Sequence, residues 1–324
     1  MTNEGWIFRG QGQPLERVPL PTPQPGPHEV LIDVAAAGLC HSDVGIISGP
    51  GAAWISQLPI VLGHEVAGTI SELGSEVTGF AIGDRVAVAL IGHPAEEWRG
   101  MVSPGISRDG GFQRQAIAED VELIPIPDGV SFSAAATATD SIATAYHAVT
   151  AAGAVEQGTV VGIVGMGGLG MNAVQIALWL GAEVHGVDVS ADARDQASTL
   201  GAASVHEQVV DLAAFSPDVI IDFAGYASTT GPAVEVVRRG GTVVVVGLGQ
   251  DTVPLPKNTL VFNLVRVVGS AGASRDDLRT VLQLLAEGTI TSTVRTIPFA
   301  ELANGMERLT AGNVVGRLAL DVTA

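Results

Sequence analysis

The sequence has only one cysteine among its 324 residues, and it is poor in aromatic and basic side chains. A single cysteine excludes an intrachain disulfide, which fits a reducing compartment, and we expect a cytoplasmic protein. Aromatic residues make up 4% of the chain and hydrophobic residues 47%, so Val, Ala, Leu and Ile must build the core. Acidic residues outnumber basic ones by 34 to 16, and the formal charge of −18 argues against nucleic acid or an anionic membrane as a partner.

The sequence also lacks the patterns of secretion and of membrane insertion. No basic segment followed by an apolar stretch stands near the N-terminus, so we predict no secretion signal. Residues 160–182 carry no charged side chain and are long enough to span a bilayer. Glycines in the first half, with Asn172 and Gln175 in the second, favour a strand, a glycine turn and a helix instead.

The chain is long enough for two domains, and its pattern changes near residue 139. Before that point, short alternating runs separated by Gly and Pro turns predict strands at 29–35, 65–73, 85–89 and 113–117. From residue 160, strands alternate with helices, which predicts a parallel sheet covered on both faces. The expected strands of this sheet are 160–164, 183–187, 218–222, 242–246 and 266–269, with helices between them that include 169–180, 191–200 and 233–238. After residue 272 we expect helices at 275–287 and 299–311 and a final strand at 317–322.

Cys40 and His64, 24 positions apart, offer a thiolate and an imidazole to a metal ion. Zn²⁺ favours these donors, and a catalytic zinc site has three protein ligands and one open position. The alternative is a buried small thiol and a core histidine with ordinary hydrogen bonds.

A glycine-rich run, Gly-Met-Gly-Gly-Leu-Gly at 165–170, stands between an expected strand and an expected helix. In that context the glycines permit a tight turn and a close approach to a pyrophosphate, whose charge then faces the helix N-terminus. We expect a dinucleotide to contact Gly165, Gly167, Gly168, Leu169 and Gly170.

Asp188 follows Gly165 by 23 positions, at the end of the next expected strand. A carboxylate there accepts hydrogen bonds from ribose hydroxyls and repels a 2′-phosphate, which predicts NAD rather than NADP. The alternative is that Asp188 is a helix cap or a turn residue.

The string that begins at residue 63, G-H-E-x-x-G-x-x-x-x-x-G-x-x-V, resembles the pattern of the zinc-containing alcohol dehydrogenases of the medium-chain dehydrogenase/reductase superfamily. With the other motifs, the resemblance covers most of the chain. It implies an α/β protein with a GroES-like catalytic domain (1–139 and 272–324) and a doubly wound Rossmann domain (140–271). It further implies one catalytic zinc, NAD, hydride transfer between an alcohol, secondary or aryl, and its ketone or aldehyde, and a homodimer or homotetramer.

The third zinc ligand, implied by the same resemblance, falls on Asp140, where most relatives have a second cysteine. Aspartate can bind zinc through one oxygen. The alternative is that Asp140 only caps a helix that starts near Ser141, because aspartate is a favoured N-cap residue. Glu65, next to His64, would be a transient fourth ligand or a carboxylate that supports the ligands.

Proton transfer in this family begins at a Ser or Thr two residues after the cysteine, which is Ser42 here. The relay often ends in a histidine three residues further on, where this chain has Gly45. The proton would then leave through the cofactor ribose and water, or through His41. Asp43 is expected to hold the local backbone.

Other positions match the cofactor and substrate contacts of the family. Arg317 matches an arginine that contacts the pyrophosphate, although it could be an ordinary surface arginine. Val246, Leu248 and the segment 269–272 match the surroundings of the nicotinamide. Trp54 and Leu90 match the wall of an apolar substrate pocket, although Trp54 could instead pack in a surface loop.

Many relatives bind a structural zinc through four closely spaced cysteines, and residues 91–111 contain none, which excludes that site. Two rival functions remain. A zinc-free quinone or enoyl reductase of the same superfamily would not need Cys40 and His64. A non-catalytic NAD-binding protein would share the fold and lack turnover.

Overall fold

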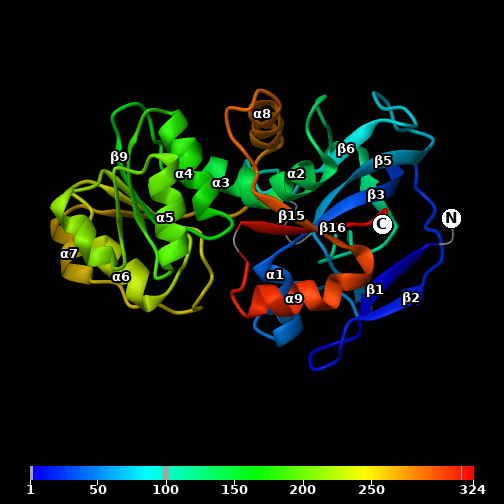
Figure 1. Cartoon of the computed structure of the whole chain (residues 1–324), viewed down its shortest axis with the longest axis horizontal. Helices are drawn as coiled ribbons and strands as arrows, with labels where there is room; N and C mark the ends of the chain where they lie inside the picture. Colours follow the sequence, from blue (N-terminus) through cyan, green and yellow to red (C-terminus); the bar gives the residue numbers. More distant parts are fainter. Residues whose placement is uncertain (1–2, 98–101, 315) are drawn as a thin grey trace. The chain divides into compact units, whose positions relative to one another are not determined.

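The computed structural model describes residues 3–97, 102–314 and 316–324. Its contacts divide the chain into two compact units, Met1–Asp140 with Ala273–Ala324, and Ser141–Gly272 (Figure 1). We call them the first and the second unit. Within the described ranges, no helix is both long and apolar enough to cross a membrane.

A seven-stranded sheet in the order β15-β16-β3-β5-β6-β8, with β7 paired to β3, forms the centre of the first unit. Its strands are β3 (Glu29–Leu39), β5 (Glu65–Leu73), β6 (Arg85–Val88), β7 (Gln115–Glu119), β8 (Leu123–Pro125), β15 (Val294–Pro298) and β16 (Arg317–Asp321). A smaller sheet contains β1 (Glu4–Phe8), β2 (Glu16–Pro19) and β4 (Ile60–Val61). The helical segments are α1 (His41–Ser48), η1 (Ala52–Trp54), η2 (Asp120–Glu122), α2 (Phe132–Thr137), α8 (Arg275–Ala286), η6 (Phe299–Glu301) and α9 (Leu302–Thr310).

The core of the first unit is mainly aliphatic, as the composition predicts. It joins side chains from both sheets with those of α9. Eight of the eleven residues of β3 are buried, because it pairs with β5 along one edge and with β7 and then β16 along the other. These pairings place the end of β3, where Cys40 follows, opposite the start of β5 and beside β16.

The second unit is a parallel six-stranded sheet in the order β11-β10-β9-β12-β13-β14. Its strands are β9 (Val160–Val164), β10 (Glu183–Val187), β11 (Ser204–His206), β12 (Val219–Asp222), β13 (Thr242–Val245) and β14 (Arg266–Gly269). The helical segments are α3 (Ala143–His147), η4 (Ala148–Ala152), α4 (Gly170–Trp179), α5 (Ala191–Leu200), η5 (Val209–Ala214), α6 (Ala227–Val236) and α7 (Lys257–Phe262), while η3 (Ala138–Ile142) crosses the division between the units. The register aligns the carboxyl ends of β9, β10, β12, β13 and β14, so the loops that follow them share one edge.

The doubly wound sheet and the β-rich unit confirm the α/β fold class. Several predicted bounds were wrong: the strand expected at 29–35 extends to Leu39, and the helix expected at 299–311 is η6 followed by α9. The helix expected at 233–238 is α6, which begins at Ala227 and includes Gly231 and Pro232. The strand expected at 113–117 is Gln115–Glu119, whose register with β3 runs from Asp33 to Glu29.

Candidate functional site

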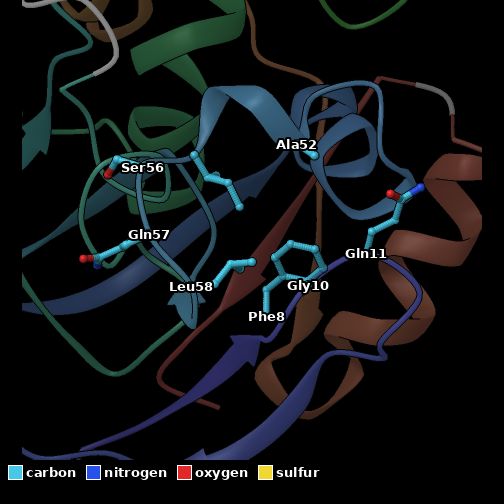
Figure 2. A pocket seen from close by; sticks show the side chains of 8 residues that line it. Phe8, Gly10, Gln11, Ala52, Ser56, Gln57 and Leu58 are labelled. Atoms are coloured by element: carbon cyan, nitrogen blue, oxygen red, sulfur yellow. The ribbon is translucent and has the colours of Figure 1, made fainter.

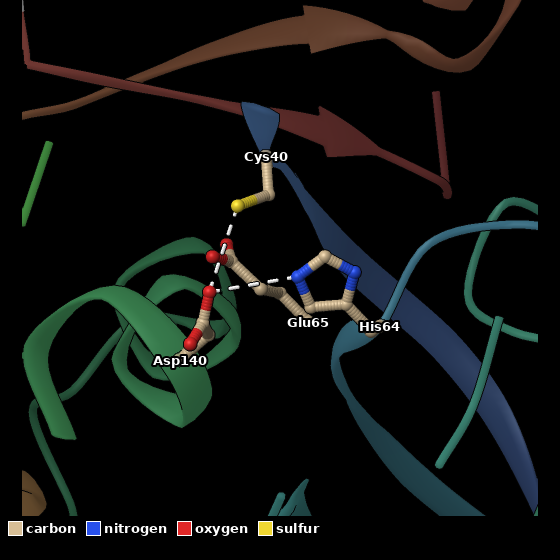
Figure 3. A group of neighbouring side chains, drawn as sticks. All are labelled: Cys40, His64, Glu65 and Asp140. Carbon is tan, nitrogen blue, oxygen red and sulfur yellow. Dashed lines mark hydrogen bonds and ion pairs between the residues drawn. The ribbon is translucent and has the colours of Figure 1, made fainter. Parts of the chain in front are cut away.

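Four side chains of the first unit, Cys40, His64, Glu65 and Asp140, place their potential ligand atoms within 4.8 Å of one another (Figure 3). Cys40 is the N-cap of α1, and His64 immediately precedes β5. The antiparallel pairing of β3 and β5 sets Gly38 opposite Glu65 and so brings the two motifs together.

The sulfur, nitrogen and oxygen donors converge on one point. Asp140 Oδ2 lies 3.5 Å from Cys40 Sγ and 3.5 Å from His64 Nε2. Cys40 and His64 are only 5% and 3% exposed. A thiol, an imidazole and a carboxylate that face each other in a buried site form a donor set that suits zinc. This arrangement disfavours the alternative of an unrelated buried thiol and core histidine.

Asp140 lies inside a π-helical turn, η3, in a continuous helical stretch from residue 132 to residue 152. The stretch starts at Ser131, whose hydroxyl accepts a hydrogen bond from the N–H of Ala134 at 3.2 Å. The next helix, α3, has Ile142 as its N-cap and no side-chain cap. Asp140 is therefore not a helix cap. Single π-turns within α-helices are frequent at functional sites.

Asp43 contacts both motifs of the cluster. Its contact with His64 was not predicted from the sequence. Its fully buried carboxylate accepts hydrogen bonds from the N–H groups of Cys40 at 3.3 Å and Gly63 at 3.2 Å, as expected of a residue that holds the backbone. The same carboxylate also lies 3.4 Å from His64 Nδ1. Burial lowers the pKa of His64, but the carboxylates of Asp43 and Asp140 outweigh it and raise that pKa well above the usual value. An aspartate three residues after the N-cap resembles a capping box and was the available sequence indication.

Glu65 is fully buried, and its Oε1 accepts a hydrogen bond from the Arg317 guanidinium. Burial raises the pKa of Glu65 to about 7, against the opposing attraction of Arg317. Its Oε2 has no hydrogen-bond partner among the described residues. A Cβ on Gly38 would lie 1.7 Å from that oxygen, so only glycine fits there. Arg317 is 5% exposed, and the interpretation as a surface arginine was wrong.

Ser42 lies near the cluster, with its hydroxyl 3.7 Å from Cys40 Sγ. Leu90 is half-buried and follows β6. Trp54 ends η1, packs against the core of the first unit and lies close to Gly51.

A hollow of about 250 Å³ lies beside η1 in the first unit (Figure 2). Phe8, Ile55 and Leu58 supply apolar surface to it, and Gln57 supplies a polar side chain. Neither the metal-ligand candidates nor Trp54 line this hollow. It is therefore separate from the cluster around Cys40.

Three glycines of the loop after β9, in the second unit, meet different constraints. Gly165 has φ of 81°, a left-handed conformation that favours glycine. A Cβ on Gly167 would meet nothing within 4 Å, which leaves room for a ligand. A Cβ on Gly170 would lie 2.0 Å from the carbonyl oxygen of Gly165, so the close packing of helix on loop requires glycine. These are the turn, approach and packing roles of a dinucleotide-binding loop, with Gly168 and Leu169 completing it before α4.

Asp188 follows β10 and joins the glycine loop to the start of α5. Its Oδ2 accepts a hydrogen bond from the N–H of Met166 at 2.6 Å, and its Oδ1 accepts one from Ser190 at 2.8 Å. Ser190 itself is the N-cap of α5, so Asp188 is not the cap. Arg194 donates a hydrogen bond to the Asp188 carbonyl at 2.7 Å and so places a cation beside the predicted ribose position. Arg194 was not among the residues predicted from the sequence.

The nicotinamide-side positions also lie in the second unit. Val246 directly follows β13 and is half-buried, and Leu248 is 76% exposed. The segment 269–272 begins at Gly269, the last residue of the edge strand β14, at the same edge of the sheet.

Comparison with known proteins identifies the family. One family model, the alcohol dehydrogenase GroES-like domain, matches residues 26–128, and another, the zinc-binding dehydrogenase, matches residues 168–287. An alcohol dehydrogenase of Geobacillus stearothermophilus is 32% identical over 96% of this chain and 97% of its own length. The chain belongs to the zinc-type alcohol dehydrogenases. The resemblance seen in the sequence is thereby confirmed, and the dehydrogenase is favoured over both rival functions.

Two solved structures extend the comparison to the whole enzyme. The acetophenone reductase from Geotrichum candidum, solved in complex with NAD, has a TM-score of 0.90 and 32% identity, covering 99% of this chain and 97% of the reductase. The thermostable alcohol dehydrogenase from Pyrobaculum aerophilum, solved with cobalt and zinc, has a TM-score of 0.89 and 29% identity, covering 99% of each chain.

Proposed function

We propose that the enzyme interconverts a secondary or aryl alcohol and its ketone or aldehyde with NAD(H), and that Cys40, His64 and Asp140 hold one catalytic zinc. The observation that carries the proposal is the convergence of three different donor atoms on one point, with Asp140 Oδ2 3.5 Å from both Cys40 Sγ and His64 Nε2. Similarity to a reductase named for an aryl ketone and solved with NAD supports the substrate class and the cofactor. Trp54 and Leu90 are proposed as walls of the substrate pocket.

The ligand residues prepare the site for chemistry in distinct ways. When bound, zinc supplies Lewis-acid polarisation of the alcohol or carbonyl oxygen. The Asp43 carboxylate, 3.4 Å from His64 Nδ1, favours the tautomer with its proton on that atom and leaves Nε2 free for the metal. Cys40 and Asp140 would contribute two negative charges. Glu65 Oε2, which has no hydrogen-bond partner among the residues that the structure describes, lies beside them, and Glu65 is proposed as a transient fourth ligand.

Proton and hydride leave the alcohol by separate routes. Ser42, whose hydroxyl lies 3.7 Å from Cys40 Sγ, would accept the hydroxyl proton of the alcohol. Gly45 has no side chain to receive it, so the onward route is His41 or the cofactor ribose and water. When bound, the nicotinamide would supply the hydride acceptor, and the glycine loop, Val246 and Leu248 would position it. Arg317 is proposed as a contact of the pyrophosphate.

Metal analysis of protein purified without chelators tests the site directly. We expect about one zinc per chain, because the donor set offers one three-ligand site and no four-cysteine site exists. A screen of ketones and aldehydes with NADH should then show turnover. Protein without zinc would contradict the proposal, and two zinc ions per chain would contradict the missing structural site.

We further propose that the enzyme is a homodimer or homotetramer in which β14 is a subunit contact. All four residues of this edge strand are exposed, and Arg266 is its only charged residue. Val261, Phe262 and Leu264 just before it are 57%, 72% and 64% exposed. An edge strand with a single charged residue and no Pro has few of the features that prevent pairing with another chain. A second copy related by a two-fold axis would extend the sheet and cover this apolar surface.

Phe262→Glu is expected to shift the enzyme to a smaller species in sedimentation analysis, because it places a charge in the proposed contact. Ile82→Glu is the matched control, since Ile82 is a 67% exposed apolar residue of the first unit. An unchanged oligomer in Phe262→Glu, or an equal shift in Ile82→Glu, would contradict the proposed contact.

A further inference from the structure

Asp222 is a fully buried carboxylate at the carboxyl end of β12 that the proposed reaction does not use. Its Oδ1 accepts hydrogen bonds from the N–H groups of Ala224 and Gly225, both at 2.9 Å. Its Oδ2 accepts them from the hydroxyls of Thr229 at 2.8 Å and Thr230 at 2.7 Å. Across the ranges that the structure describes, no cation forms an ion pair with it. Four hydrogen bonds therefore hold this carboxylate and, through it, the turn that follows β12.

That turn supports the glycine loop. A Cβ on Gly165 would lie 3.0 Å from the backbone nitrogen of Ala224, and a Cβ on Gly170 would lie 3.5 Å from the Phe223 ring. The first glycine of the loop and the first residue of α4 thus both lie against the two residues that follow Asp222. A displacement of the turn would displace the loop.

The same turn also supports the segment beside the predicted nicotinamide position. The carbonyl oxygen of Asp222 accepts hydrogen bonds from the N–H groups of Val246 at 2.9 Å and Gly247 at 3.0 Å. Gly225 has φ of 69°, and a Cβ on it would lie 2.0 Å from the carbonyl oxygen of Gly247. Asp222 therefore connects the loops after β9, β12 and β13, at the edge where a doubly wound sheet binds its dinucleotide.

We propose that Asp222 is a positioning residue for the cofactor: it fixes the spacing between the loop that binds the pyrophosphate and the segment that flanks the nicotinamide. It acts through the turn 223–225, because its own side chain is fully buried and saturated by four donors. This inference rests on the proposed placement of NAD on the glycine loop.

The test measures NADH affinity by calorimetry on the zinc-loaded enzyme. Asp222→Ala leaves two N–H groups and two hydroxyls without their acceptor, so we expect the Kd for NADH to rise at least about tenfold. The KM for NADH should rise more than kcat falls, and zinc content should stay unchanged. Asp222→Asn keeps the shape and one acceptor oxygen, while both hydroxyls can turn to accept from the amide. Asp222→Asn should therefore retain most of the NADH affinity, with a Kd about threefold higher than that of the parent enzyme.

Asp218→Asn is the matched control, because Asp218 immediately precedes β12 at the opposite end of the sheet. Its carboxylate accepts a hydrogen bond from Val160 at 2.8 Å and pairs with Arg238 at 2.5 Å. Asp218→Asn should lower the thermal stability of the enzyme without changing its Kd for NADH.

The results distinguish failure of the positioning role of Asp222 from failure of the proposed NAD site. Folded Asp222→Ala protein that binds NADH within about twofold of the parent enzyme would overturn the positioning role. Equal weakening in Asp218→Asn and Asp222→Asn would overturn it as well, since general loosening would then explain the effect. If Asp222→Ala does not fold, the two asparagine variants decide. Failure of the unmodified enzyme to bind NADH would instead contradict the proposed function.

Discussion

Replacing Asp140 by alanine is expected to abolish turnover while NADH binding stays nearly intact. The variant leaves Cys40 and His64 as two protein ligands, so zinc content should fall together with the rate. Lewis-acid stabilisation is worth several kcal/mol, which predicts a loss of at least about 10³-fold in kcat/KM. NADH binding should persist, because the predicted cofactor loops belong to the second unit, whereas Asp140 belongs to the first. Elemental analysis, steady-state kinetics and NADH titration on one preparation measure all three quantities.

Two companion variants make this test specific. Asp140→Cys restores the commoner ligand set of the family and should retain zinc, whereas Asp140→Asn is less informative because its amide oxygen can still bind weakly. Thr139→Ala is the matched control within the same π-turn. Thr139 is 2% exposed and donates to the Ala136 carbonyl at 2.8 Å, so the variant disturbs the helix without removing a ligand. Asp140→Ala protein with full zinc and undiminished kcat would remove Asp140 from the site and leave Glu65 as the third ligand.

Strands and helices with unbroken local patterns could be predicted from the sequence to the residue. β5, β9, β10, β14 and α5 have the expected bounds, since each is a continuous or periodic run that ends at a turn residue or a helix cap. The start of α6 could not be placed, because Pro232 lies inside the helix. Its missing N–H costs the helix a hydrogen bond, yet the packing of Ala233 and Val234 in the core maintains the element. Local propensity carries no information on that packing.

The ligand candidates could be found from residue type and motif, but their supporting contacts could not. Asp43, in the first turn of α1, faces His64 because its carboxylate also accepts the N–H of Gly63, which directly precedes His64. Glu65 and Arg317 are 252 positions apart and meet because β5 and β16 both pair with β3. The choice between cap and ligand for Asp140 depended on a π-turn, which has no periodic pattern in the sequence.

Cofactor preference is the second property in which we expect a large effect, and it depends on Asp188. The unmodified enzyme should use NADH at least about 100-fold better than NADPH in kcat/KM, because a carboxylate facing a 2′-phosphate costs several kcal/mol. Asp188→Ser should raise kcat/KM with NADPH about tenfold or more. It should also weaken NADH binding, since Asp188 Oδ2 accepts the hydrogen bond of Met166 N–H and so shapes the glycine loop.

Arg194 supplies the control that separates repulsion from simple loosening of the loop. Its guanidinium donates to the Asp188 carbonyl at 2.7 Å, close enough to the ribose position to attract a 2′-phosphate once the carboxylate is gone. In Asp188→Ser combined with Arg194→Ala, the gain with NADPH should therefore shrink, while the loss with NADH should remain. Steady-state kinetics on the parent enzyme and the two variants measure kcat/KM with NADH and with NADPH. Equal or better kcat/KM with NADPH in the parent enzyme would show that Asp188 does not face the ribose. A gain with NADPH that survives removal of Arg194 would assign the preference to the carboxylate alone.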